Sequence, residues 1–115
     1  MASRLDTLTF VSEQAILDLH EDLLALFGGP GGHDYAKVCS IAAYPLQKLA
    51  CSNPPPSIPA LAAQYAFAAA KFHAFTDGNK RLALALMDLF LIQNEYELVS
   101  KSDDNVEAIL ALASG

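Results

Sequence analysis

The sequence has few of the features that mark membrane or secreted proteins. Its longest strongly apolar run, Leu82 to Ile92, is well short of the ~20 residues that a membrane-spanning helix needs. The N-terminus, MASRLDTLTF, has no long apolar region of the kind found in export signals. Only two cysteines are present, without the CxxC spacing of a metal site, so we expect small buried or free thiols. These absences predict a cytoplasmic protein without a membrane span.

Basic residues are also scarce. Seven lysines and arginines stand against thirteen acids, and the formal net charge is -6. This balance argues against a general binder of nucleic acid or acidic membranes. Three of the seven cations, Lys71, Lys80 and Arg81, nevertheless fall within an eleven-residue block that holds one acid, Asp77. Any anion site must therefore be local, and we expect it in this block.

Alanine and leucine, in contrast, are abundant. Hydrophobic residues make up 53% of the 115 positions, and these two types dominate. Such a composition favours packed helices over strands, which predicts an all-α fold. The length suits one core and is too short for two, so residues 1–115 are expected to form a single domain.

Helical periodicity and helix-breaking residues divide the first half of the chain. Ser12 is typical of an N-cap and opens an amphipathic helix of about four turns. That helix ends at the GGPGG run of residues 28–32, which predicts a mobile loop. A second helix is expected over residues 35–49, with a kink or a break at Pro45. The proline-rich residues 52–59 then form a rigid surface connector.

The second half contains the most apolar segments. Residues 60–72 predict a helix so rich in alanine that it should pack closely against a neighbour. Another helix is expected from near Asn79 to about Asn94, and its lack of a polar face predicts the buried central helix of the domain. Residues 95–99 suggest a short extended piece, followed by a terminal helix that starts near residue 103 or 104.

The segment HAFTDGNKR, residues 73–81, joins the last two of these helices. The N-terminal end of a helix is electropositive, so the cations Lys80 and Arg81 oppose the usual preference for acids in the first turn. Each residue also has a structural interpretation, in which Asp77 is the N-cap, Phe75 anchors the loop and His73 is a hydrogen-bonded core histidine. The two cations remain unexplained by that interpretation.

A bound phosphate would explain them. The backbone N–H groups of Gly78, Asn79 and Lys80 can surround a phosphate oxygen at the helix N-terminus. Lys80 or Arg81 can then neutralise its charge with charge-assisted hydrogen bonds. The segment is therefore a candidate anion site.

Two further side chains would make such a site reactive. Asp77 lies where a carboxylate can hold Mg²⁺ beside bound phosphates. His73, four residues earlier, can accept the proton of an incoming hydroxyl. A metal ion, an anion hole and a base together predict phosphoryl or nucleotidyl transfer.

With these residues, HAFTDGNKR resembles the signature of the Fic/Doc family, HxFx(D/E)(A/G)N(K/G)R. The family places this motif between two helices of an all-helical domain. The early acidic helix with its GG loop, and Asp34 at the start of the next helix, resemble the short Doc branch, so the resemblance covers nearly the whole chain. The matching anchor positions are His73, Phe75, Asp77, Asn79 and Arg81.

The resemblance implies a role for each matching residue. His73 would be the catalytic histidine that activates the target hydroxyl, Asp77 would hold Mg²⁺, and Arg81 would contact phosphates. Lys71 lies where Doc-like toxins can carry another cation, and it is equally well explained as a solvated lysine at a helix end. The anion-hole segment would consist of Gly78, Asn79 and Lys80.

Lys80 stands at the position that separates the branches of the family. Fic proteins that transfer AMP resemble GNGR with a further arginine downstream, whereas Doc resembles NKR and transfers the terminal phosphate of a nucleotide to elongation factor Tu. A lysine intrudes on the pocket that glycine leaves open, and no arginine follows Arg81. We therefore expect a Doc-like toxin kinase that uses ATP, with an AMP or UMP transferase as the alternative.

Two residues depart from the family pattern. Leu82 replaces the usual threonine after the arginine, and Phe72 replaces the frequent asparagine before the histidine. Because both are expected beside the site, a catalytically silent nucleotide-binding module is a further alternative. The family's self-inhibitory pattern, Ser/Thr-x-x-x-Glu followed by Gly or Asn, is absent. The resemblance to Doc therefore implies restraint by another protein, a Phd-like antitoxin whose disordered tail folds against the toxin.

Overall fold

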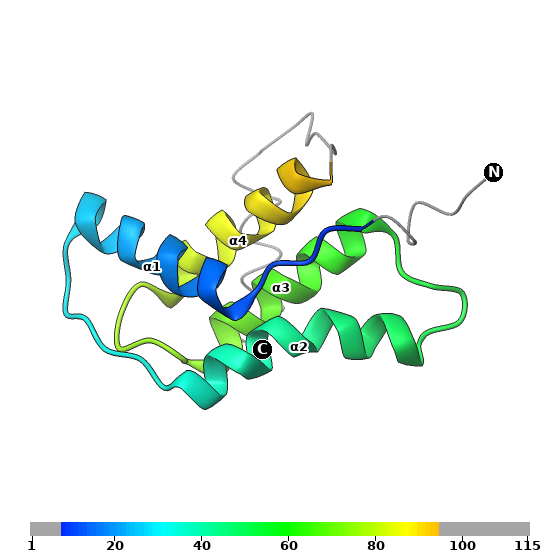
Figure 1. Cartoon of the computed structure of the whole chain (residues 1–115), viewed down its shortest axis with the longest axis horizontal. Helices are drawn as coiled ribbons and strands as arrows, with labels where there is room; N and C mark the ends of the chain where they lie inside the picture. Colours follow the sequence, from blue (N-terminus) through cyan, green and yellow to red (C-terminus); the bar gives the residue numbers. More distant parts are fainter. Residues whose placement is uncertain (1–7, 95–115) are drawn as a thin grey trace.

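Four helices make up most of the described chain. The structure, a computed structural model, describes residues 8–94 and contains no strand within them. The all-α prediction is confirmed, whereas the extended piece and the terminal helix expected after residue 94 lie outside the described residues. In chain order (Figure 1) the helices are α1 (Glu13–Phe27), α2 (Tyr35–Cys51), α3 (Ile58–Phe72) and α4 (Asn79–Gln93).

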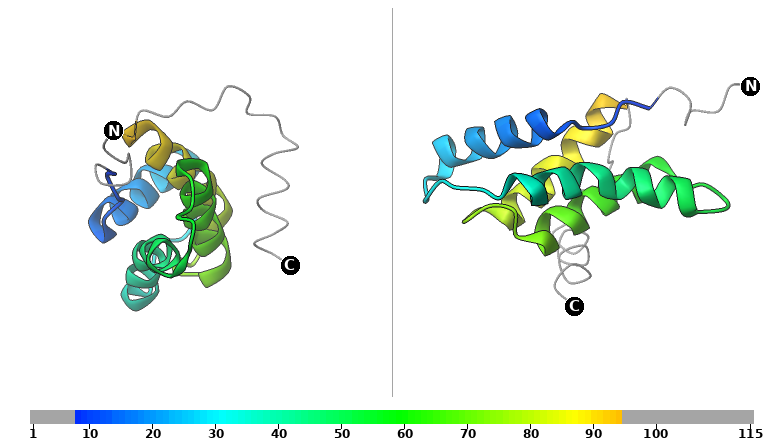
Figure 2. Two further views of the ribbon diagram at one scale, coloured as in Figure 1. Left: turned by 90° about the vertical axis from the view of Figure 1, so that its right-hand side faces the viewer. Right: turned by 60° about the horizontal axis from the view of Figure 1, so that its bottom comes forward.

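Helix α3 lies at the centre of the described fold, where it packs against α4 and α2 (Figures 1 and 2). Helix α1 covers one end and contacts both α2 and α4. Small side chains let neighbouring helices approach closely. Because α3 packs against α4 and α2 and buries several alanines, the predicted close packing of the alanine-rich helix is confirmed. The buried alanines of α3 are Ala62, Ala66, Ala68 and Ala69.

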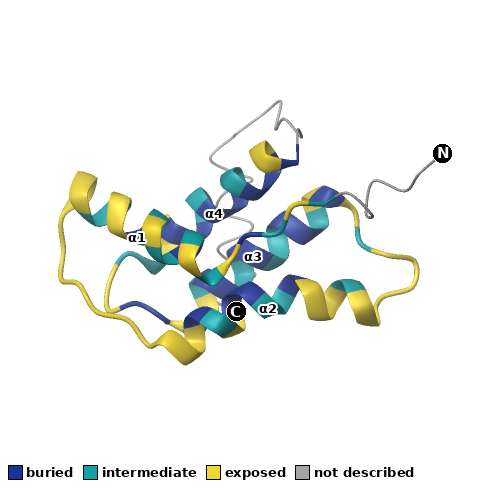
Figure 3. Cartoon of the chain, in the orientation of Figure 1, coloured by how far each residue is buried: buried dark blue, intermediate teal, exposed yellow. Residues whose placement is uncertain are grey.

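Helix α4 is buried along one side (Figure 3). Its buried face consists of Leu82, Ala83, Leu86, Met87, Phe90 and Leu91. Leu84 and Leu89 are half-buried, while Ile92 is 70% exposed. A buried helix after residue 78 was predicted and is present, but the central position belongs to α3.

Helices α2 and α3 differ from the predictions, and α2 ends at Cys51 instead of residue 49. Helix α2 continues through Pro45, so a break into two shorter helices does not occur. Pro45 lacks the N–H that would bond the carbonyl of Ile41, but both side chains are buried and their packing compensates for that loss. Helix α3 begins at Ile58 instead of residue 60, because Ser57 is its N-cap and a proline is well accommodated in a first turn.

The segment before α1 is attached to the core through Tyr65 of α3. The hydroxyl of Tyr65 accepts a hydrogen bond from the backbone N–H of Val11 at 3.0 Å. The Tyr65 side chain is fully buried, and this burial raises the pKa of its hydroxyl to about 12. A buried backbone donor is thereby paired, as stable folding requires.

The loop after α1 pairs with residues 74–76, the loop before α4 (Figure 2, right). Asp34 N–H donates to the carbonyl of Ala74 at 2.7 Å, and Thr76 N–H donates to the carbonyl of Gly32 at 3.1 Å. These two bonds form an isolated antiparallel bridge between His33 and Phe75. The end of the loop that was predicted to be mobile is therefore held beside the candidate site.

The remaining compositional predictions concern thiols and membranes. Cys39 and Cys51 are both free, as expected from their spacing. Among residues 8–94, no helix combines the length and apolar character that crossing a bilayer requires.

Candidate active site

The candidate site is built on the turn between α3 and α4. His73 ends α3 in the left-handed region, with φ 53° and ψ 48°. This conformation is uncommon for a residue with a side chain, and it is found most often at turns and functional sites. The turn directs the chain away from α3 and leaves the His73 side chain exposed. The interpretation of His73 as a core histidine is therefore wrong.

Asn79 closes the motif loop with its side chain. Its Oδ1 accepts a hydrogen bond from the backbone N–H of Phe75 at 3.2 Å. Its Nδ2 donates to the carbonyl of the same residue at 2.8 Å. Phe75 itself is buried, as its interpretation as a loop anchor predicts. These two hydrogen bonds therefore define the shape of the loop between residues 75 and 79.

The N-terminus of α4 has no side-chain cap. Gly78, in the left-handed region with φ 80°, is the N-cap residue, so Asp77 does not cap this helix as the structural interpretation required. Side chains do cap the other three helices, through Ser12, Asp34 and Ser57. The first N–H groups of α4 therefore remain available to an anion, and the helix dipole favours negative charge there.

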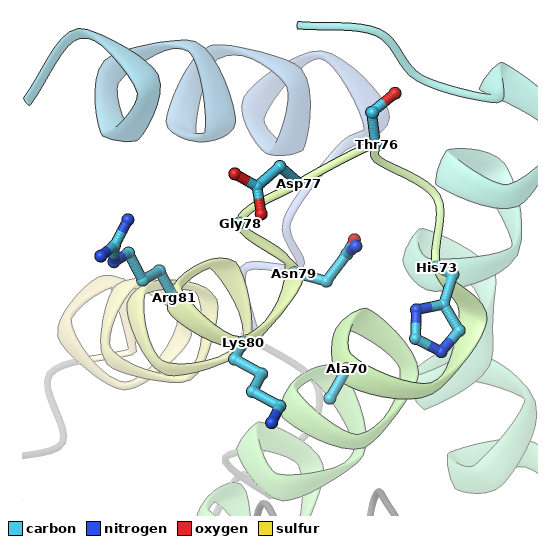
Figure 4. A pocket seen from close by; sticks show the side chains of 8 residues that line it. All are labelled: Ala70, His73, Thr76, Asp77, Gly78, Asn79, Lys80 and Arg81. Atoms are coloured by element: carbon cyan, nitrogen blue, oxygen red, sulfur yellow. The ribbon is translucent and has the colours of Figure 1, made fainter. Parts of the chain in front are cut away.

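A cleft of about 430 Å³ opens at this helix end (Figure 4). It brings together most of the residues that the sequence analysis selected. Asp77 and Arg81 lie on one side of the motif loop and His73 lies on the other, with Asn79 between them. The residues that line it are Ala70, His73, Thr76, Asp77, Gly78, Asn79, Lys80 and Arg81.

Asp77 combines a fixed backbone with an exposed carboxylate. Its backbone carbonyl accepts a hydrogen bond from Nε2 of His20 at 2.7 Å. Its carboxylate accepts no hydrogen bond within residues 8–94, and Gly29 leaves room for it, since a Cβ there would lie 2.8 Å from Oδ2. One exposed carboxylate beside an uncapped helix N-terminus fits Mg²⁺, which takes one or two protein carboxylates together with substrate phosphates.

No larger metal cluster competes with this interpretation in the described part of the chain. There, His, Cys, Asp and Glu side chains do not form any group of three or more that could hold a metal ion. An all-protein cage of the kind that holds structural zinc or calcium is thus not present among residues 8–94.

The two cations of the motif lie in different surroundings. Arg81 places its guanidinium carbon 4.3 Å from the ring centre of Phe27, at the end of α1. Such a cation–π contact limits the positions open to a long flexible side chain. Lys80 is exposed and extends from the first turn of α4 toward Ala70 of α3 (Figure 4). Both charges therefore line the cleft at which the helix N-terminus opens.

This arrangement of histidine, carboxylate, open helix end and two cations agrees with a comparison to protein families. The model of the Fic/DOC family matches residues 10–91, which is well over half of the chain. This chain belongs to the Fic/DOC family. Proteins of the family are typically transferases that move part of a nucleotide onto a protein target. No curated protein matches the sequence.

The role of each candidate residue in this Fic/DOC protein remains a prediction. The candidates do not all lie at the cleft. Six of the seven candidates line the cleft. Lys71 is exposed in the last turn of α3 and is not among the lining residues. Thr76 and Ala70 line the cleft but were not selected from the sequence.

The two departures from the family pattern do not line the cleft. Leu82 is fully buried in the core, and its N–H makes the first backbone bond of α4, to the carbonyl of Gly78 at 2.9 Å. Phe72 is half-buried and packs edge-on against Tyr44 of α2, with ring centres 5.5 Å apart. Their side chains are thus part of the helix packing of this family member.

Two residues of α1 contact the motif and were not predicted from the sequence. His20 bonds Asp77, and Phe27 lies against Arg81. A signal for His20 was present, because this polar residue interrupts the apolar stripe of the helix, four residues after the buried Ile16. Its partner could not be identified, since the contact joins residues 57 positions apart.

Proposed function

We propose that this Fic/DOC protein is a Doc-like kinase that transfers the terminal phosphate of ATP to a hydroxyl of a protein. The observation that carries the proposal is the position of Lys80. Its side chain extends along the cleft toward α3, on the lining where glycine would leave open space. A nucleotide that meets this lysine is pushed into a different orientation from one that meets glycine. The phosphorus presented to His73 is then the terminal one.

The residues of the cleft suit an in-line transfer. His73, exposed at the end of α3, takes the proton of the target hydroxyl as its oxygen attacks the terminal phosphorus. The bond from that phosphorus to the bridging oxygen breaks, and ADP leaves. The free N–H groups at the start of α4, together with Lys80 and Arg81, stabilise the negative charge of the phosphates.

Asp77 is the residue that would hold Mg²⁺ in this reaction. When bound, the ion supplies positive charge to the phosphate oxygens. The protein's own contribution is an exposed carboxylate on a backbone fixed by the hydrogen bond between its carbonyl and His20. A single carboxylate suffices because substrate phosphates and water provide the other ligands.

The protein target and partner are proposed from the Doc branch. We expect elongation factor Tu to be the substrate, so that its modification blocks translation, and we expect a Phd-like antitoxin to restrain the enzyme in the cytoplasm. The terminal phosphate of ATP is thus the group transferred, and a serine or threonine hydroxyl is the acceptor.

Labelled ATP tests the reaction class. The protein is incubated with Mg²⁺, elongation factor Tu and ATP labelled either at the terminal or at the α-phosphate. Kinase activity places only the terminal label on the target. Transfer of the α-label, with a mass gain of a nucleotide, would instead select AMP transfer. If neither label moves while ATP still binds, a silent nucleotide-binding module is selected.

Three variants separate the roles of the cleft residues. His73→Ala should lower transfer by about 10²- to 10⁴-fold, the usual contribution of a general base. Lys80→Ala removes charge-assisted bonds to phosphate and should lower transfer by about 10- to 100-fold. Lys71→Ala, a change of the same charge on an exposed residue outside the cleft lining, is the matched control. Equal losses in both lysine variants would refute the role of Lys80.

A further inference from the structure

His20 is a buried histidine that the proposed chemistry does not use. It lies on α1 and is 4% exposed. It contacts two residues of the motif, Phe75 and Asp77. Its ring stacks on Phe75 of the motif, with ring centres 3.7 Å apart and planes 19° apart. Its Nε2 lies 2.7 Å from the backbone carbonyl oxygen of Asp77. Two residues of the motif therefore rest on one side chain of another helix.

The hydrogen bond has only one possible direction. A carbonyl oxygen accepts hydrogen bonds and cannot donate them, so Nε2 of His20 must carry the proton. The stacked ring of Phe75 fixes the plane of the imidazole, and this plane aims Nε2 at Asp77. The tautomer and the orientation of His20 are thus both determined by the motif.

The carbonyl that His20 holds belongs to the residue whose carboxylate faces the cleft. Asn79 fixes the backbone at Phe75, on one side of Asp77, through two hydrogen bonds. On the other side, Gly78 adopts the left-handed conformation and provides no side chain that could hold the turn. Without His20, the peptide between Asp77 and Gly78 would have no other hydrogen bond to its carbonyl within the described residues.

We propose that His20 is a positioning residue for Asp77. By holding the carbonyl of Asp77, it sets the direction of that residue's carboxylate toward a divalent cation, and it sets the orientation of the first N–H groups of α4. This inference rests on the proposed function, in which Asp77 holds Mg²⁺. It assigns to α1 a role in the site in addition to its packing against α2 and α4.

Two substitutions separate the hydrogen bond from the packing. His20→Phe keeps an aromatic ring to stack on Phe75 but has no donor for the carbonyl of Asp77. His20→Gln places an amide N–H near the position of Nε2 and restores the donor. A role in packing alone predicts that the phenylalanine variant resembles the wild type more closely. A positioning role predicts that the glutamine variant does.

The first measurement is binding of Mn²⁺, used as a spectroscopic substitute for Mg²⁺, in the presence of ATP. Water proton relaxation reports the dissociation constant without any transfer reaction. We expect it to rise about 10-fold in His20→Phe and to stay within about 3-fold of wild type in His20→Gln, because one hydrogen bond changes. Thermal unfolding is measured in parallel. Equal Mn²⁺ affinity in His20→Phe and wild type would overturn the proposal.

A second measurement needs no variant and therefore does not depend on whether the substituted chains fold. Nitrogen-15 chemical shifts of the imidazole in the wild-type protein distinguish the two neutral tautomers. We expect the proton of His20 on Nε2. A proton on Nδ1 alone would contradict the hydrogen bond to Asp77 and overturn the positioning role.

Failure of this inference is distinguishable from failure of the proposed function. If wild-type protein binds Mn²⁺ and ATP, and His20→Phe binds them equally well, only the role of His20 is refuted. If wild type binds neither, the metal role of Asp77 is refuted together with the positioning of Asp77 by His20. If Mn²⁺ binding follows the prediction but no phosphate is transferred, the positioning role stands and the kinase assignment is refuted.

Discussion

Replacing Gly29 tests whether metal binding at the cleft depends on the position of the Asp77 carboxylate. A Cβ atom added at Gly29 would lie 2.8 Å from Oδ2 of Asp77, whereas ordinary contact begins at 3.4 Å. The carboxylate must therefore move by about 0.6 Å or rotate away. Because Oδ2 is the end of a side chain, this movement has a small energetic cost. It changes where the negative charge is placed, and a displacement of that order can cost up to about 10²-fold in a preorganised site.

Other glycines of the same loop provide matched controls. Gly29 has φ +116°, so Gly29→Ala also strains the backbone. Gly28, with φ +76° and no atom within 4 Å of an added Cβ, gives the strain without the contact with Asp77. A Cβ added at Gly31 would meet open space, and φ there is not positive, so Gly31→Ala introduces neither backbone strain nor a contact with Asp77. We expect Gly28→Ala and Gly29→Ala each to lower the free energy of unfolding by about 1–3 kcal/mol, and Gly31→Ala to change it by less than about 1 kcal/mol.

The measurement is again Mn²⁺ binding with ATP, combined with unfolding in urea. Gly29→Ala should raise the Mn²⁺ dissociation constant by about 10-fold, because only this variant displaces the carboxylate. Gly28→Ala should leave it within about 2-fold of wild type despite a similar loss of stability. If Gly28→Ala and Gly29→Ala bind Mn²⁺ equally well, the reasoning that connects Gly29 to metal binding through Asp77 is refuted.

Two other residues allow predictions from their contacts. Phe27→Leu removes the aromatic face under Arg81, so we expect the KM for ATP to rise about 2- to 5-fold, measured against Leu26→Ala, which alters a residue that is 77% exposed on the same turn. A KM unchanged by Phe27→Leu would contradict this role. Tyr65 has its pKa raised to about 12, so the unfolded chain loses this proton first as pH rises above 10, and stability should fall by about 2–3 kcal/mol between pH 10 and 12. In Tyr65→Phe, urea unfolding should show a smaller loss of stability between pH 10 and 12. The variant should also be about 1–3 kcal/mol less stable at pH 7, because the N–H of Val11 is left unpaired. An unchanged dependence of stability on pH above 10 would refute the assignment of this effect to Tyr65.

Local signals explain why much of the fold was predictable. Ser12 accepts a hydrogen bond from the N–H group three residues later, so it marks the start of α1, as its sequence context predicted. The motif was equally predictable from the sequence, since its residues are contiguous and the cleft forms at the turn that they make. Such features depend on short stretches of chain, which a sequence displays directly.

Features that depend on contacts between residues far apart in the sequence were less predictable. Pro45 predicts a helix break from local chemistry, but its side chain is fully buried and α2 is continuous through it. Asp77 has good N-cap chemistry, yet the left-handed backbone of Gly78 takes that position and leaves the carboxylate in the cleft. In both cases tertiary packing or backbone geometry overrides a valid local preference.

The contacts of α1 show how tertiary structure changes the meaning of the motif. His20 and Phe27 are seven residues apart, so they lie on one face of α1. Their partners Asp77 and Arg81 are four residues apart, across the start of α4. One helix face therefore supports both the residue expected to hold the metal and a residue expected to bind phosphate. Because both supports belong to one rigid element, a change in how α1 sits would displace both ends of the candidate site together. The acidic first helix, whose sequence predicted only packing against the core, thus supports two residues that line the cleft without lining it itself.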